Sequence, residues 1–275
     1  MRKLIVNADD FGMALPVNEA VEEAHCSGIL TSASLMVAGE GFADAVDRAL
    51  RLPKLAVGLH LALARSRPIL PPEQIPNLVD VHGELPGNLF VAGVRCFFLP
   101  SVRRQLAAEI RAQFEAFRAT GLALDHVNAH NHFHLHPTVH GLIAQVGAEY
   151  GCRAVRTPWE EGGGPAQLAT APWVALLRRR LRRAGMYTND RVFGLRHSGA
   201  MDEARVVSLL GELPEGVTEI YFHPATRSSP ELDRAAPEYR REAEIKALTS
   251  AAVRTAVSAA GAELTTYGDC TRLEL

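Results

Sequence analysis

The alternation of apolar runs with helical patterns limits what this chain can fold into more than any other feature. Apolar runs typical of buried strands lie at residues 3–8, 33–38, 55–61, 123–128, 153–156, 191–195, 217–222 and 262–266. Helical patterns lie between them, at residues 15–27, 41–51, 101–119, 137–150, 172–184, 202–213 and 238–260. Repeated βα units predict a parallel sheet, and their number predicts an α/β fold of the distorted (β/α) barrel type with seven or eight strands. An open doubly wound sheet is the alternative, although no GxGxxG motif follows the first run.

Length and hydrophobic content favour a single domain. The chain has 275 residues with 47% hydrophobic content, which suits one large core spanning residues 1–275. Two segments interrupt the βα rhythm: a long Pro-rich insertion at about 65–100, and residues 158–172, with three glycines at 162–164. Connections this long in a compact domain are usually lids or binding loops, or else disordered.

Charge and cysteine usage exclude several classes of protein. The net charge of -2 gives no electrostatic footprint for nucleic acid. The four cysteines form no CxxC pair and are expected to be reduced thiols. The apolar run after Arg2 and Lys3 is too short for a signal peptide, so we expect a cytoplasmic protein.

Polar side chains interrupt or end three of the apolar runs. Asp9 and Asp10 end the run KLIVNADDFG, His60 lies near the end of LAVGLHLAL, and a histidine tract follows LALDHVNA. Burying such groups is costly without a partner. Because the carboxyl ends of parallel strands meet at one edge of a barrel, we expect Asp10, His60 and His130 to lie together.

The histidine tract is the strongest chemical signal. Six of the 11 histidines lie between His126 and His140, and His130, His132, His134 and His136 occupy alternate positions. In an extended segment that spacing places all four rings on one face. Imidazole is the commonest ligand of zinc-class metals, so the tract predicts part of a metal site; a solvated polar loop is the alternative.

Two histidines and one carboxylate on different strand ends are typical of a catalytic metal that keeps an open position for water. We expect one divalent ion, Zn or Mg, held by Asp10, His60 and His130. Asp9 is then free to act as general base, and His223, after the run VTEIYF, is the candidate that returns a proton. Asp9 and Asp10 can share the site only if the backbone turns there. His132 and His134 cannot both enter a tetrahedral shell, so at least one supports the ligands, faces substrate or is an alternative ligand.

The motifs NADDFG, GLHL, the H-x3-H-x-H-x-H core of the tract and EIYFHP together resemble the YdjC-like carbohydrate deacetylases, in order and spacing, over nearly the whole chain. The stretch FGLRHSGAMDEARVVSLLGELPEGVTEIYFHPA is most similar to the branch associated with hopanoid biosynthesis. The resemblance implies a distorted barrel with one divalent metal that removes an N-acetyl group from an amino sugar. It implies Asp9 as base, Asp10, His60 and His130 as ligands, and His223 as acid or oxyanion partner.

The chain departs from the family pattern in three places. Asn128-Ala129 stands where relatives often have Asp-Ser, Asn131 where they often have His, and Ala225 where they often have Gly. These changes leave the expected ligands in place but alter their surroundings, so Asn128 is expected to support the ligands or meet substrate.

Other functions remain open from the sequence. They are deacetylation of a soluble oligosaccharide such as a chitin disaccharide, a metal phosphoesterase on the same scaffold, and a non-catalytic metal- or sugar-binding protein. A phosphoesterase with two metals needs more bridging carboxylates than this tract supplies. Asp9 and His223 argue against a non-catalytic protein.

The segment 172–184 suggests where substrate is met. It places Trp173 and four aliphatic residues on one side of a helix and crowds five arginines, at 178–180, 182 and 183, toward one end. Such a helix can lie on an anionic membrane surface, which would suit a glycolipid substrate and a peripheral position at the inner membrane face. The alternative is an ordinary barrel helix with its arginines in water. The sequence also leaves open a homodimer.

Overall fold

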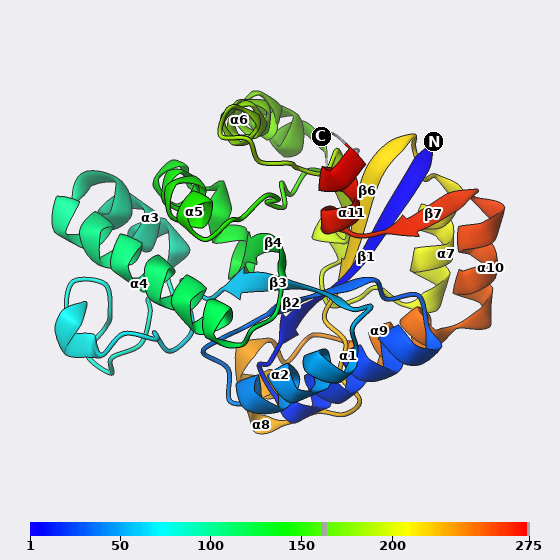
Figure 1. Cartoon of the computed structure of the whole chain (residues 1–275), viewed down its shortest axis with the longest axis horizontal. Coiled ribbons are helices and arrows are strands. Elements are labelled where there is room, and N and C mark those ends of the chain that lie inside the picture. Colours follow the sequence, from blue (N-terminus) through cyan, green and yellow to red (C-terminus); the bar gives the residue numbers. More distant parts are fainter. Residues whose placement is uncertain (161–163, 274–275) are drawn as a thin grey trace.

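The centre of the computed structural model, which describes residues 1–160 and 164–273, is a curled parallel sheet that forms a half-barrel (Figure 1). Its strands follow the order β4-β3-β2-β1-β6-β5, and β7 also pairs with β1. The bounds are β1 Arg2–Phe11, β2 Ser32–Leu35, β3 Ala56–Leu61, β4 Leu124–Ala129, β5 Arg191–Phe193, β6 Gly216–Phe222 and β7 Ala262–Thr265. The predicted single-domain α/β fold with a distorted barrel is confirmed.

Helices cover the outside of the curled sheet (Figure 1). They are α1 Leu15–Ser27, α2 Phe42–Arg51, α4 Pro100–Ala119, α5 Pro137–Glu149, α6 Gly164–Arg183, α7 Glu203–Gly211, α8 Pro230–Ala235, α9 Arg241–Thr249, α10 Ala251–Ala259 and α11 Tyr267–Leu273. Their apolar faces pack on strand residues with no exposure, such as Leu4, Val6 and Leu59. Within the described ranges, no helix is both long enough and apolar enough to pass through a bilayer.

Three expected elements differ in the structure. The expected strand at 153–156 forms only isolated bridges, Val127 to Val155 and Ala154 to Tyr187, because it hydrogen-bonds to a single residue on each side, Val127 and Tyr187. The expected helix at 238–260 is divided into α9 and α10 by Ser250, whose hydroxyl caps the second helix at the amides of Ala252 and Val253. Part of the expected loop at 158–172 is helical from Gly164, and residues 161–163 lie outside the described part.

The Pro-rich insertion is ordered and carries a helix of its own. It contains a short 3-10 turn, Pro72–Gln74, and the helix α3, Leu89–Phe98, which begins at Asn88 with a side-chain cap on the amide of Val91. Buried polar residues of α4 hold its first residues. Glu109 accepts hydrogen bonds from the amides of Ile69 (2.9 Å) and Leu70 (3.0 Å).

The histidine tract does not continue as a strand, so the expected extended conformation is wrong. Residues His130–Leu135 form a 3-10 turn between β4 and α5, and Asn131 and His132 have positive φ angles of 54° and 53°. The chain must reverse here to reach Pro137, the first residue of α5. The four alternating histidines therefore point in different directions.

Candidate metal centre

The two neighbouring aspartates share one site because the backbone of β1 turns at Asp10. Asp10 has a φ of 64°, a left-handed value that a non-glycine residue rarely adopts, and the pairing of β1 with β2 changes register between Ala8 and Phe11. The carbonyl of Asp10 accepts a hydrogen bond from the amide of Met13 at 2.9 Å, which closes the turn. Both carboxylates consequently face the same cavity, as their expected shared role requires.

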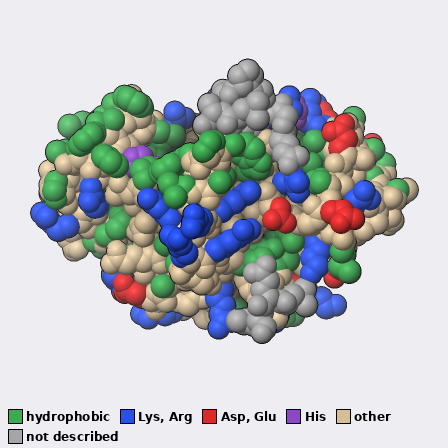
Figure 2. Space-filling model, turned by 90° about the horizontal axis from the view of Figure 1, so that it is seen from above, with side chains coloured by type: hydrophobic (Ala, Val, Ile, Leu, Met, Phe, Trp, Pro, Cys, Tyr) green, Lys and Arg blue, Asp and Glu red, His purple; other side chains and the backbone are tan. Residues whose placement is uncertain are grey.

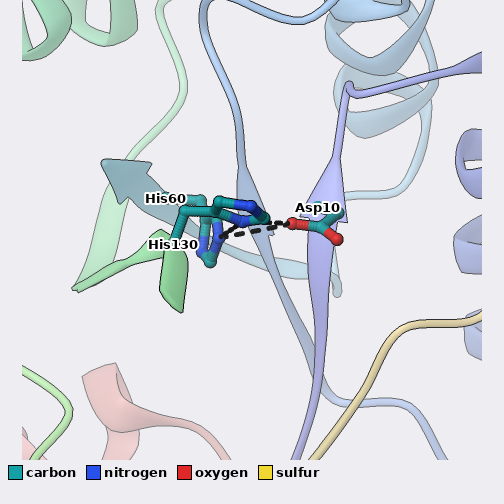
Figure 3. A group of neighbouring side chains, drawn as sticks. All are labelled: Asp10, His60 and His130. Carbon is teal, nitrogen blue, oxygen red and sulfur yellow. Dashed lines mark hydrogen bonds and ion pairs between the residues drawn. The ribbon is translucent and has the colours of Figure 1, made fainter. Parts of the chain in front are cut away.

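Asp10, His60 and His130 converge at the carboxyl ends of β1, β3 and β4 (Figure 3). Asp10 Oδ1 lies 3.4 Å from His60 Nε2 and 3.1 Å from His130 Nδ1, and the two nitrogens lie 3.4 Å apart. Among the described residues this is the single group of His, Cys, Asp and Glu side chains close enough to hold a metal ion. One carboxylate oxygen and two imidazole nitrogens are donors that a divalent ion of the zinc class accepts, so the set fits the metal expected from the sequence.

Asn128 fixes the orientation of the His60 ring. Its Oδ1 lies 2.7 Å from His60 Nδ1, which leaves Nε2 directed at Asp10 and His130. The Asn128 amide nitrogen also donates to Asp9 Oδ1 at 3.0 Å and to Ser34 Oγ at 2.8 Å. A ligand histidine whose other ring nitrogen donates to a fixed acceptor keeps its tautomer and direction. Asn128 therefore links the His60 ring to Asp9 and Ser34 in one hydrogen-bonded network.

Asp9 is held by an arginine that the sequence reasoning missed. Arg156 Nη1 donates to Asp9 Oδ2 at 2.7 Å and Arg156 Nη2 to Oδ1 at 2.9 Å, and both side chains are buried. Asn7, Ser34 and Asn128 add three further hydrogen bonds to Oδ1. Burial raises the pKa of the Asp9 carboxyl, but the charges of Arg156, His60 and His223 and the hydrogen bonds from Arg156 together outweigh burial and hold that pKa well below its usual range.

Arg156 is itself neutralised behind the site. Its Nε donates to both carboxylate oxygens of Glu219 at 3.0 and 2.9 Å, and the Tyr267 hydroxyl donates to Glu219 Oε2 at 2.6 Å. The signal for this network was present in the sequence. Arg156 ends the apolar run CRAVR and Glu219 interrupts VTEIYF, and a charge inside a buried strand requires a partner.

His223 lies on the opposite wall, after β6. It lines a cavity of about 230 Å³ together with the three candidate ligands and Asp9. Burial lowers the pKa of His223 to about 4, although the two aspartates oppose that shift. Its Nδ1 has no hydrogen-bond partner among the described residues. The other cavity-lining groups include Ser198, Tyr221, Tyr239 and Arg241.

The remaining histidines of the tract have separate surroundings. His132 lines the cavity and its Nε2 lies 3.2 Å from the Tyr221 hydroxyl, while burial lowers its pKa to about 3. His134 is buried behind His132, with ring centroids 6.0 Å apart, and is not part of the cavity wall. His136 faces Phe97 of α3 instead. Neither His132 nor His134 belongs to the convergent group of three donors.

Asp10 has a second cationic neighbour. Burial raises the pKa of the Asp10 carboxyl, but the charge of His130 and its hydrogen bond outweigh burial and hold that pKa well below its usual range. Arg241 Nη1 lies 3.9 Å from Asp10 Oδ2, and its guanidinium stands 5.0 Å from the centre of the Tyr239 ring. The cavity therefore holds both carboxylates in ionised form beside the rings of His132 and His223, whose pKa values are lowered by burial.

Comparison with known proteins agrees with this geometry. The family model described as YdjC-like protein matches residues 3–259. A carbohydrate deacetylase from Brevibacillus brevis is 32% identical over 273 residues, covering 97% of this chain and 99% of that protein. One from Geobacillus stearothermophilus is 30% identical over 277 residues and covers 99% of each chain.

The fold is shared with a solved structure as well. A candidate cellobiose-phosphate cleavage protein from Enterococcus faecalis superposes with a TM-score of 0.78 at 27% identity, covering 98% of both chains. The match extends over the same strands and helices that carry the three converging donors. This chain belongs to the YdjC-like protein family, and its relatives' names support a carbohydrate deacetylase.

Proposed function

We propose that this protein removes an N-acetyl group from an amino sugar, using one divalent metal held by Asp10, His60 and His130. The observation that carries the proposal is the convergence of those three donors beside the buried pair Asp9 and Arg156. The names of the relatives supply the substrate class, a carbohydrate, and the reaction, deacetylation.

The residues around the donors suit amide hydrolysis. A divalent metal supplies polarisation of the amide carbonyl and acidification of water. Asp9 Oδ2 accepts a single hydrogen bond, from Arg156, whereas Oδ1 accepts four, so Oδ2 is the oxygen with capacity to take a proton from water. His223, across the cavity, presents an unpartnered Nδ1 that can bond the substrate oxygen or serve the leaving amine.

The competing functions have less support. A phosphoesterase with two metals needs a second set of ligands, and the described residues contain one convergent set. A non-catalytic binding protein has no need for an ionised carboxylate fixed by a buried arginine next to the metal site.

We further propose that the acetylated sugar is carried by a lipid, in the manner of an N-acetylglucosaminyl hopanoid, and is met at the inner face of the cytoplasmic membrane. Support comes from the similarity of residues 193–225 to the hopanoid-associated branch. A soluble chitin disaccharide is the alternative substrate, and the same assay compares the two.

The test is release of acetate from a panel of N-acetylated sugars, lipid-linked and soluble, by protein first stripped of metal and then supplied with Zn²⁺ or Mg²⁺. We expect release to depend on added metal and to be faster with the lipid-linked sugar. Acetate release by fully stripped protein would overturn the proposed metal dependence. No release from any N-acetyl sugar would overturn the proposed deacetylation.

Asp9→Asn separates chemistry from binding in the same assay. Neutralising a general base is expected to lower turnover by about a hundredfold or more while metal content stays unchanged. Asp47→Asn, the same substitution at an exposed aspartate of α2, is the matched control. If Asp9→Asn removes the metal and leaves the activity of the reloaded protein intact, the roles of the two aspartates are exchanged.

A further inference from the structure

The helix α3 buries small residues and exposes large apolar ones, which is the reverse of an ordinary surface helix. Its buried positions are the small residues Ala92, Gly93 and Cys96, and its large side chains point outward. Phe90 is 81% exposed and Phe98 is 71% exposed. Aromatic side chains this exposed add little to packing of the monomer, so their presence needs another explanation.

These side chains are concentrated in one place. Of the thirteen exposed large hydrophobic residues in the described part of the chain, six lie between Phe90 and Leu99. Figure 2, which looks at the molecule from above, shows hydrophobic side chains gathered over the α3 end and a cluster of Lys and Arg side chains beside them over α6. Monomeric proteins rarely keep such a patch unless it meets another apolar phase.

The segment that carries the patch, from Leu85 to Ala108, has charged residues of one sign only. No Asp or Glu occurs between Leu85 and Ala108, whereas Arg95, Arg103 and Arg104 do. On α6, the exposed arginines Arg179, Arg180, Arg182 and Arg183 form no salt bridge with any acidic side chain that the structure describes. Three of them also border one surface hollow. A partner with negative charge over an apolar layer complements this face.

The two helices have complementary roles. The apolar residues Val174, Leu177 and Leu181 of α6 are buried in the fold, so these three side chains are not available to enter a bilayer. Four of the five arginines of α6 are exposed to solvent, and α3 supplies most of the exposed large apolar side chains of the two helices, to which α6 adds only Leu176 among its described side chains.

The two helices border the same short segment next to the metal centre. The Phe97 ring of α3 lies 6.3 Å from the ring of His136, and the indole of Trp173 in α6 donates to the carbonyl of Leu135 at 3.1 Å. Leu135 and His136 end the turn that begins with the candidate ligand His130. A surface formed by α3 and α6 thus contacts the end of the turn whose first residue, His130, lines the cavity.

We infer that α3 and α6 form a docking face for an anionic lipid bilayer. The docking face consists of Phe90, Val94, Phe97 and Phe98 of α3 with Arg179, Arg182 and Arg183 of α6. The aromatic side chains enter the headgroup region and the arginines contact lipid phosphates. A second copy of the chain is a poorer occupant, because apposing two such faces brings arginines against arginines without acidic partners.

The docking face gives the proposed function a location. A lipid-linked amino sugar is presented at a bilayer, and the docking face would bring the cavity to it; this reading rests on the proposed function. Vesicle binding itself needs neither metal nor sugar, so it is measured independently of deacetylation.

The experiment is co-sedimentation of the whole protein with vesicles of phosphatidylcholine alone and of an equimolar mixture with phosphatidylglycerol. We expect binding to the anionic vesicles and release by salt. Phe90→Ser/Phe98→Ser should weaken binding about a hundredfold, and Arg179→Gln/Arg183→Gln about thirtyfold. The controls Leu50→Ser/Val207→Ser and Arg51→Gln/Lys246→Gln change exposed residues of the same kind on other helices and should bind as the unchanged protein does.

Three outcomes overturn the docking face: equal recovery in the supernatant with and without anionic lipid, binding that survives both double variants, and binding lost equally in the controls. Light scattering on the same proteins adds a fourth, since conversion of a dimer to a monomer by Phe90→Ser/Phe98→Ser without vesicle binding would assign the face to a second copy. Turnover of a soluble N-acetylated sugar by these variants should be unchanged, so loss of docking is distinguished from failure of the proposed reaction.

Discussion

The metal centre buries charged side chains, whereas the docking face exposes large apolar side chains to solvent. At the metal centre, Asp9 is 2% exposed and accepts hydrogen bonds from four different residues. On α3, Phe90 and Phe98 remain in solvent and contact little of the fold. The first arrangement satisfies Asp9 within the chain, since its buried charge is paired with that of Arg156. The second is incomplete, and its partner must come from outside.

The largest expected effect is at the ligands themselves. Asp10→Ala and His60→Ala should each remove the metal and lower the rate of deacetylation by about a thousandfold or more, because the metal that would polarise the amide carbonyl and activate water is lost. Metal content by elemental analysis and acetate release measure the two effects. His132→Ala is the control, because it removes a histidine ring that lines the same cavity but is not one of the three candidate ligands. Retention of metal in His130→Ala with loss in His132→Ala would show that the wrong histidine of the tract was assigned.

The buried charges behind the site should dominate stability. Arg156→Met leaves the buried carboxyl groups of Asp9 and Glu219 without their cation, and we expect a loss of about 3–5 kcal/mol in the free energy of unfolding, measured by denaturant titration. Arg111→Met breaks the exposed pair with Glu149 and should produce no measurable loss. Comparable stabilities of the two variants would mean that the buried network contributes little.

The orientation of the His60 ring should have a smaller, separable effect. Asn128→Ala removes the acceptor of His60 Nδ1, and we expect metal affinity to fall by about 10–100-fold with the metal still bound at saturation. Titration with a competing chelator gives the affinity. Asn128→Asp keeps an acceptor at the same position and should restore most of the metal affinity. Equal loss of affinity in both variants would show that the acceptor at residue 128 does not influence metal binding.

The smallest effect is expected on α3, and it sharpens the contrast. Phe90→Ser/Phe98→Ser should change the free energy of unfolding by no more than about 0.5 kcal/mol, because these rings are already in water. Phe114→Ala, at a ring that is 1% exposed, should cost about 3–5 kcal/mol in the same denaturant titration. A large loss in the α3 variant would show that its rings support the fold rather than an external contact.

Periodicity was enough to predict the barrel and the strand ends that carry Asp10 and His60, because buried strands leave long apolar runs. It could not predict the conformation of the histidine tract, since alternating histidines suit a strand as well as a turn, and the left-handed residues at Asn131 and His132 leave no pattern in composition. Arg156 was missed because its partners, Asp9 and Glu219, lie 147 and 63 residues away, and pairing over such distances is set by the sheet and not by local sequence.

The position of β1 has a consequence for how the chain reaches this state. All three candidate ligands are made in the first half of the chain, but β1 pairs along Arg2–Ala8 with Gly216–Phe222 of β6 and along Arg2–Ile5 with Ala262–Thr265 of β7. A nascent chain that has emerged as far as His130 therefore lacks the strands that support one whole side of β1. Contacts this distant in sequence close slowly, so assembly of the site should wait for the last strands to leave the ribosome, and a chain interrupted before residue 216 would hold its ligands without a frame to fix them.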